Sequence, residues 1–398
     1  MLDIGQIHRT EYELVSDRSV QIAIAEAPGR IHFLGEHGDP ADGLYLSAAI
    51  DRFAQVAVNM RKDNFLRFYA ADFQERKRGS LVNFKYRRED RWANYLKIAV
   101  FVFLELGVPL KGLNFTVSGN IPQQIGLASS TAIETASAVA LRKLLRVHLS
   151  DESLAQKLHK GHLAFFNSGA SLADYQTCLL ARKEHFLVID ASAQEIKRIK
   201  SPFSRFRFLL VDSRVPRIGV ENELSLRRND ALKGLGLLSQ KSAGSSFRDF
   251  ASSDLLEVLG NFPEQIRRRS MHIVQELRRV MDGYDALERG DIAVFSRIIF
   301  HSHESLRDLY EVSCPEIDWL VKRAQEIENT AGSRMIGHGF GGCTYAIIPR
   351  EMAAEYRKRL EDYERIFGFR PVIYEVKIAS GSRTVPKRKK VYANTAHK

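Results

Sequence analysis

The stretch GLASSTAIE, residues 126–134, joins two different hydrophobic patterns. Before it, Leu113, Phe115 and Val117 alternate with polar residues, which predicts a strand; after it, residues 131–147 follow a helical period. A strand that turns into a helix through small hydroxyl residues places the helix's first unpaired N–H groups, and the positive end of its dipole, at the turn. The stretch therefore predicts a binding site for an anion such as phosphate.

The same stretch also has a purely structural explanation. A helix that starts with Ser and Thr is more often capped by its own side chains than bound to a phosphate. The chain contains no GxxxxGK[ST] sequence, so the turn is not a Walker A loop. Ser130 and Glu134, however, are four residues apart and share one face of the predicted helix. Because Mg²⁺ prefers hydroxyl, carboxylate and phosphate oxygens, we expect it to bind there.

A second loop, residues 27–43 (APGRIHFLGEHGDPADG), contains more charge and more glycine than a turn between two strands requires. Its polar functional side chains are Arg30, Glu36, His37 and Asp39. Carboxylates and imidazoles accept from, or donate to, several hydroxyl groups at once, so the loop predicts a site for a polyhydroxylated ligand. A solvated turn with incidental ion pairs is the alternative, and the loop alone does not decide between them.

A third loop, residues 337–343 (GHGFGGC), formally contains GxGxxG. A dinucleotide-binding fingerprint needs a helix after this sequence, whereas here the strand-like run CTYAIIP follows. The Rossmann interpretation is therefore rejected. We instead expect glycines such as Gly339 and Gly341 to let the backbone approach a ligand or another strand closely.

Strand-like and helical patterns are mixed in both halves of the chain. Strands are predicted around the loops and at residues 185–190, 206–212 and 372–378, whereas residues 221–303 are mostly helical. The order of these elements predicts an α+β fold with a break near residues 190–205. We therefore expect an N-terminal lobe over residues 1–195, a C-terminal lobe over 196–385 and a basic tail over 386–398.

Composition and charge limit the classes of partner that we expect for the chain. With 398 residues and 44% hydrophobic content, the chain can bury two sizeable cores. The net charge of +11 is partly local, in the run Lys387–Lys390, and no aromatic–basic interleaving is present, so we expect no nucleic-acid partner. The N-terminus lacks the apolar run of a signal peptide and no segment is apolar enough to span a bilayer, which indicates a cytoplasmic protein without a membrane partner.

The three loops occur in an order that identifies a family resemblance. PGRxxxxGEHxD is present from Pro28 to Asp39, the phosphate loop is similar to the family sequence GLSSSA, and GHGFGGC is similar to GxGFGGC. The chain resembles the GHMP-type small-molecule kinases, and most closely the galactokinases among them, over about residues 20–385. The resemblance implies a two-lobed α+β fold with the active site between the lobes.

It also implies ATP and Mg²⁺ as cofactors and phosphorylation of the anomeric C1 hydroxyl of galactose or a closely related sugar. Asp174 would take or orient the hydroxyl proton, and Arg30 would lie beside it. The residues that would bind the phosphates are Gly126, Leu127, Ala128, Ser129 and Ser130, with Ser130 and Glu134 at the metal. The residues that would bind the sugar are Glu36, His37, Asp39, Gly339 and Gly341. The oligomeric state and any role of the basic tail stay open.

Several positions depart from the family pattern. The family sequence HTDY is HGDP here, Ala128 replaces a serine of the phosphate loop, and Leu224 replaces a tyrosine that contacts the sugar. Two alternatives follow: a sister kinase for a uronic acid, an amino sugar or arabinose, and a non-catalytic sensor of sugar and ATP. A sensor has no need for the full catalytic set, so the presence of all four residues favours catalysis: Arg30, Asp174, Ser130 and Glu134.

Overall fold

The structure is a computed structural model, and it describes residues 3–386 except for positions 18, 39–42, 167–169, 218, 242–243, 251–259 and 261. The elements of the first half are α1 Ile4–Glu11, β1 Ala23–Leu34, β2 Leu44–Met60, β3 Phe65–Ala70, β4 Glu75–Ser80, η2 Arg88–Asp90, α2 Ala93–Glu105, β5 Leu113–Gly119, α3 Ser129–Leu145, α4 Asp151–Phe166, α5 Leu172–Leu180, β6 His185–Asp190 and β7 Glu195–Lys200. The elements of the second half are β8 Phe206–Asp212, α6 Val220–Lys241, η3 Phe247–Asp249, α8 Glu264–Glu288, α9 Ile292–Ser305, η4 Leu306–Tyr310, α10 Pro315–Gln325, β9 Ser333–Ile336, β10 Cys343–Pro349, η5 Arg350–Met352, α11 Ala353–Arg359, α12 Asp362–Phe367, β11 Val372–Val376 and β12 Arg383–Thr384.

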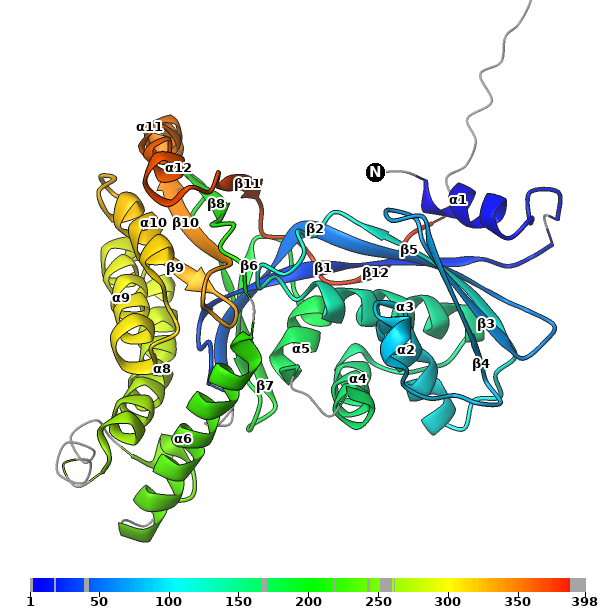
Figure 1. Cartoon of the computed structure of the whole chain (residues 1–398), viewed down its shortest axis with the longest axis horizontal. Helices are drawn as coiled ribbons and strands as arrows, with labels where there is room; N and C mark the ends of the chain where they lie inside the picture. The colour runs from blue at the N-terminus through cyan, green and yellow to red at the C-terminus, as the bar shows by residue number, and fades with distance from the viewer. Residues whose placement is uncertain are drawn as a thin grey trace, which may run out of the picture.

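The larger sheet has the strand order β12-β1-β2-β5-β3-β4, and the β6–β7 hairpin pairs with the start of β2. Figure 1 shows α2, α3, α4 and α5 along one face of this sheet, with α1 at the far end of the other face. Both faces of β2 are buried, because Val56 and Val58 contact the main core while Ala57 packs against Ile4 of α1. The near-continuous apolar sequence of β2 follows from this double burial.

The smaller sheet is antiparallel, with the order β11-β8-β10-β9. Helices α8, α9 and α10 lie beside it at the opposite end of the molecule from α1 (Figure 1). The amphipathic pattern of α10 buries Leu320 and Ala324 against Ile348 of β10. Among the helices of the described residues, none is long and apolar enough to cross a membrane.

One hydrophobic core joins the two sheets. The ring of Phe33, near the end of β1, lies 5.0 Å from Phe186 of β6 and 4.8 Å from Tyr345 of β10, measured between ring centroids. The Tyr345 hydroxyl also donates a hydrogen bond to the Phe33 carbonyl at 2.9 Å. The expected α+β fold is confirmed; its main core extends through both lobes, and a second cluster lies between α10 and the smaller sheet.

One sequence-based boundary, the start of the second loop, needs correction, and the expected lobe division falls within a hairpin. The loop expected from residue 27 starts only after Leu34, because β1 continues through Pro28 and Arg30 with a β-bulge between them. The division expected after residue 195 cuts the β6–β7 hairpin, and β12 returns from the C-terminal end to pair with Ala25 and Glu26 of β1. Residues 387–398 of the basic tail lie outside the described residues.

Candidate active site

Strand β1 and helix α5 bring a buried ion pair together. Asp174 lies in the first turn of α5, after Ser171, whose side chain caps the helix. The Nε of Arg30 donates to Oδ1 of Asp174 at 2.5 Å, and Nε2 of His32 lies 2.9 Å from the same oxygen. Arg30 is 7% exposed and Asp174 is 6% exposed, so the pair is largely shielded from solvent screening.

This environment fixes the charges of the pair. Burial alone would raise the pKa of Asp174, but the charge of Arg30 and the hydrogen bond with His32 hold it well below its ordinary value. For Arg30, burial would lower the pKa, and the carboxylates of Asp174 and Glu36 more than offset that effect and raise it. The aspartate is therefore an ionised hydrogen-bond acceptor, and the arginine is a permanent cation.

His32 is a site residue that the sequence analysis missed. Its Nδ1 lies 3.0 Å from the Ser47 hydroxyl, which in turn lies 2.8 Å from the Thr177 hydroxyl on α5. The available signal was spacing, because Arg30 and His32 are two residues apart on a strand and so point to the same face. His32 ties β1 to α5 at the carboxylate of Asp174.

The phosphate loop lies against Arg30. The Nη1 of Arg30 donates to the Gly126 carbonyl at 2.6 Å, and its backbone N–H donates to the Leu127 carbonyl at 3.1 Å. Gly126 has a φ of +94°, and a Cβ there would lie 2.9 Å from the Ile336 carbonyl oxygen, so glycine is required. The loop is therefore held between Arg30 and the start of the third loop.

The helix start does not have the side-chain cap that the alternative explanation required. The N-cap residue of α3 is Ala128, in the left-handed region with φ 55° and ψ 44°, and no side chain caps the helix there. The expected phosphate-binding residues Ser129 and Ser130 occupy the first helical positions. The amide groups of this first turn thus keep the hydrogen-bonding capacity that an anion would use.

The two residues expected at the metal are placed differently. Ser130 is partly exposed at the start of α3, and its hydroxyl has no partner among the described residues. Glu134 is fully buried, with one carboxylate oxygen 3.0 Å from Nδ1 of His162 and the other accepting from the Tyr175 hydroxyl at 2.5 Å. Burial raises the pKa of Glu134, and the contacts with His162 and Tyr175 oppose this. Ser130 fits a Mg²⁺ ligand, whereas Glu134 does not in this arrangement.

The second loop is anchored from the C-terminal lobe. Glu36 accepts a hydrogen bond from the Gly337 amide at 2.9 Å, and Gly35 donates to Oε1 of Glu276 at 2.9 Å. Burial would raise the pKa of Glu36, but Arg30, His32 and Arg334 lower it to about 2. Burial lowers the pKa of His37 to about 3, so this imidazole is neutral. Asp39 lies outside the described residues.

Behind the loop, His37 forms part of a stack of rings. It lies 4.7 Å from Tyr310, which lies 4.9 Å from His272, between ring centroids. The Nε2 atom of His37 is buried and has no hydrogen-bond partner in the described structure. An unpartnered buried nitrogen at this position is consistent with a hydrogen bond to a ligand hydroxyl.

In the third loop, the glycines make close backbone contacts. The amide of Phe340 donates to the Val312 carbonyl at 2.6 Å, and a Cβ on Gly339 would lie 2.2 Å from the same oxygen. The Gly341 carbonyl accepts from Nη2 of Arg217 at 2.9 Å, and Nη1 of Arg217 donates to the Gln124 carbonyl at 3.1 Å. Arg217, which the sequence analysis did not select, therefore connects the third loop with the phosphate loop.

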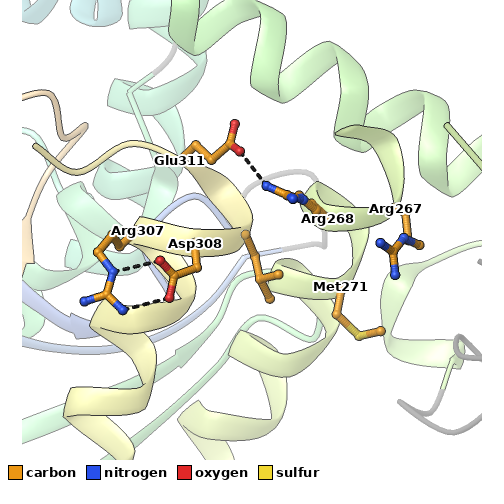
Figure 2. A pocket seen from close by; sticks show the side chains of 7 residues that line it. Arg267, Arg268, Met271, Arg307, Asp308 and Glu311 are labelled. Carbon is orange, nitrogen blue, oxygen red and sulfur yellow. Dashed lines mark hydrogen bonds and ion pairs between the residues drawn. The ribbon is translucent and has the colours of Figure 1, made fainter. Parts of the chain in front are cut away.

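A separate charged cavity lies on α8 and η4. Figure 2 shows its lining, in which Arg307 pairs with Asp308 and Arg268 pairs with Glu311. The cavity has a volume of about 480 Å³, and none of the sequence-predicted site residues lines it. These carboxylates pair with two of the three lining arginines, and the third, Arg267, lies 4.0 Å from Glu264, so each of them has an acidic partner.

Comparisons with known proteins agree with this geometry. Three family models match the chain: the galactokinase galactose-binding signature over residues 10–60, the GHMP kinases N terminal domain over 94–182 and the GHMP kinases C terminal domain over 284–360. A protein of Treponema pallidum (strain Nichols) named "Putative galactokinase" is 37% identical over 368 residues, covering 91% of this chain and 92% of that protein. A galactokinase of Roseiflexus sp. (strain RS-1) is 33% identical over 360 residues, covering 90% and 92%.

Solved structures show the same fold. The Lactococcus lactis galactokinase, crystallised with galactose, superimposes with a TM-score of 0.90 at 23% identity, covering 96% of this chain and 100% of that one. The Methanococcus jannaschii mevalonate kinase gives a TM-score of 0.63 at 17% identity, covering 92% and 100%. The three ordered loops, the contact of the first loop with Arg30, that of the third loop with Glu36 and these relatives lead to one conclusion: the chain belongs to the GHMP kinase family, in its galactokinase group.

Proposed function

We propose that this protein is an ATP-dependent galactokinase that phosphorylates the anomeric C1 hydroxyl of galactose. The observation that carries the proposal is the placement of one arginine: Arg30 contacts the carboxylate of Asp174 at 2.5 Å and the phosphate-loop carbonyl of Gly126 at 2.6 Å. A single cation thus touches both the group that would hold the hydroxyl and the loop that would hold ATP. The galactose-binding signature over residues 10–60 supports galactose as the sugar.

In the proposed step, the C1 oxygen bonds to the γ-phosphorus of ATP while the bond from that phosphorus to the β–γ bridging oxygen breaks. Asp174 is ionised beforehand because its pKa is held low, so it accepts the hydrogen bond of the hydroxyl and orients its oxygen. Phosphoryl transfer has a loose transition state, so the hydroxyl needs little deprotonation early in the step, and its proton then leaves through Asp174. Arg30 offsets the negative charge on the transferred group.

The remaining residues bind and position the substrates. Glu36, His37 and Asp39 bind sugar hydroxyls, with Gly339 and Gly341 shaping the adjoining backbone. The backbone amides from Gly126 to Ser130, in the loop and at the start of α3, bind the ATP phosphates. Ser130 is the proposed Mg²⁺ ligand, and the metal, when bound, neutralises phosphate charge. We place this activity in the cytoplasm.

A coupled ADP-release assay across aldoses, uronic acids and N-acetylhexosamines tests the proposal. We expect turnover only with ATP, Mg²⁺ and a sugar together, and the highest kcat/KM for galactose. A higher kcat/KM for a uronic acid, an amino sugar or arabinose would make the protein a sister kinase. Sugar binding by calorimetry without any ADP release would overturn catalysis and favour a sensor.

A further inference from the structure

Glu134 occupies the centre of a contact between three helices. It lies on α3, one turn after Ser130, and it is 0% exposed. Its Oε2 accepts a hydrogen bond from the Tyr175 hydroxyl on α5 at 2.5 Å, and its Oε1 lies 3.0 Å from Nδ1 of His162 on α4. A fully buried carboxylate is costly unless such partners compensate for its lost hydration.

These partners leave little room for a metal at Glu134. A Mg²⁺ ligand must offer an oxygen at about 2.0–2.1 Å from the ion and usually faces water that completes the coordination shell. Both oxygens of Glu134 instead face protein donors inside the helical layer. Among the described residues, no group of three or more His, Cys, Asp or Glu side chains is arranged to hold a metal ion.

Tyr175 connects Glu134 to the helix that carries Asp174. Tyr175 directly follows Asp174 in α5, so its hydroxyl fixes the start of this helix against α3. On the other side, Sγ of Cys178 contacts the Pro28 carbonyl of β1 at 3.1 Å and the Thr177 hydroxyl contacts Ser47 of β2. Helix α5 is thus held from two sides, and Asp174 lies where both sets of contacts meet.

We propose that Glu134, Tyr175 and His162 form a positioning cluster that sets the distance between Asp174 and the phosphate loop, and that Glu134 does not bind the metal. Glu134 lies on the helix whose first turn would hold the phosphates, and Tyr175 lies on the helix that carries the catalytic carboxylate. A hydrogen bond between them transmits any displacement of one helix to the other. The inference rests on the proposed galactokinase function.

Tyr175→Phe is the first test, because it removes one hydroxyl and keeps the ring. A misplacement of about 1 Å costs about 10²-fold in rate, and a partial shift less, so we expect kcat to fall about tenfold. The KM for galactose and the affinity for ADP should change by less than about twofold, because neither binding loop is altered. A kcat within about twofold of the wild type would overturn the inference.

Thr116→Val is the matched control. The Thr116 residue is fully buried in β5, and its hydroxyl lies 2.8 Å from Nδ1 of His8. Like Tyr175→Phe, this variant therefore removes one buried, hydrogen-bonded hydroxyl. Helix α1, which carries His8, lies at the far end of the sheet from α5 (Figure 1). We expect a thermal destabilisation similar to that of Tyr175→Phe with an unchanged kcat. An equal loss of kcat in both variants would show a general stability effect and contradict positioning.

Glu134→Gln separates positioning from metal binding, and it keeps the metal part of the inference testable if Tyr175→Phe does not fold. Glutamine keeps an oxygen for the Tyr175 hydroxyl, so we expect kcat within about threefold of the wild type. The Mg²⁺ concentration that gives half-maximal ADP binding, measured by calorimetry, should not change. An increase of about tenfold in that concentration would make Glu134 a metal ligand and overturn the inference. A wild-type protein without sugar-dependent turnover would instead overturn the proposed function, and the inference with it.

Discussion

Two buried arginine–carboxylate pairs lie close to β1, and they differ in what else they contact. Arg30 and Asp174 are 2.5 Å apart, and Arg30 also reaches the phosphate-loop carbonyl of Gly126. Arg334 and Glu276 are 3.5 Å apart, with side chains 0% and 2% exposed. The first pair therefore borders the loops that would hold ligands, whereas the second is enclosed by protein.

The Arg334–Glu276 pair contacts the backbone of β1 and of the loop that follows it, close to Arg30. Nη1 of Arg334 donates to the backbone carbonyl of His32 at 3.3 Å, and Glu276 accepts from the Gly35 amide and the Ser302 hydroxyl. The two pairs have the same kinds of residue but different surroundings. Because Arg30 contacts the phosphate loop, we expect the first pair to act in catalysis. Because Arg334 contacts the backbone of β1, we expect the second pair to stabilise the fold. Variants of the two carboxylates should separate these effects.

Asp174→Asn should have the largest effect on activity. The asparagine keeps the shape but loses the charge that orients the hydroxyl, so we expect kcat to fall about 10²-fold or more while ADP affinity is kept. Steady-state kinetics and ADP calorimetry measure these quantities. Asp90→Asn is the control, because Asp90 forms a comparably buried ion pair with Lys97. It should lower stability and leave kcat within about threefold; an unchanged kcat in Asp174→Asn would remove this residue from the mechanism.

Glu276→Gln should instead lower stability, because it leaves the buried Arg334 without its carboxylate. We expect a loss of about 3 kcal/mol in the free energy of unfolding, measured by urea denaturation, with kcat within about threefold. Glu355→Gln, which removes an exposed partner of Arg359, should cost under about 1 kcal/mol. Equal losses in the two variants would contradict the assignment of Glu276 to the stability of the enclosed pair.

The same variant has a defined pH dependence. Burial would raise the pKa of Glu276, but the charges of Arg334 and Arg279 lower it to about 2. A carboxylate with a lowered pKa stabilises the fold above its unfolded pKa of about 4.3, and this stabilisation is lost as the pH falls towards the folded value. The stability difference between wild type and Glu276→Gln should therefore be constant near neutral pH and narrow between about pH 4.3 and pH 2.

The comparison also separates what the sequence could and could not predict. The resemblance to the galactokinases implied that Arg30 lies beside Asp174, so their pairing was expected. Glu276 and Arg334 lie within ordinary amphipathic and strand patterns, and only the tertiary fold brings them to β1. The four-residue spacing of Ser130 and Glu134 predicted that both lie on one face of the helix. This spacing does not tell whether the Glu134 side chain faces solvent or a neighbouring helix.

Arg217→Ala should have an intermediate effect, on the nucleotide side of the site. Arg217 donates to the carbonyls of Gln124 and Gly341, and burial lowers its pKa. Because hydrogen bonds from a charged group contribute about 1.5–3 kcal/mol, we expect the KM for ATP to rise about tenfold with a smaller change in kcat. Arg214→Ala, in the same segment but half exposed, should leave both parameters unchanged. A rise in the KM for galactose alone would assign Arg217 to the second loop.

Leu224→Tyr should have the smallest effect, and it tests whether position 224 borders the proposed sugar site. Leu224 is partly buried on α6 and packs against the main core, at the position where the family resemblance predicts a tyrosine that contacts the sugar. The added tyrosine hydroxyl should lower the KM for galactose several-fold. One hydrogen bond contributes about 1 kcal/mol, and a tenfold change in affinity needs about 1.4 kcal/mol.

Leu226→Tyr is the matched control for this last variant, because Leu226 lies on the same helix and is 56% exposed. It adds the same ring and hydroxyl where no ligand is expected, so the KM for galactose should not change. If the unmodified protein already binds galactose tightly and strictly, the leucine does not loosen the proposed sugar site. In that case Leu224→Tyr should raise the KM, because the added hydroxyl would occupy space that the sugar already fills.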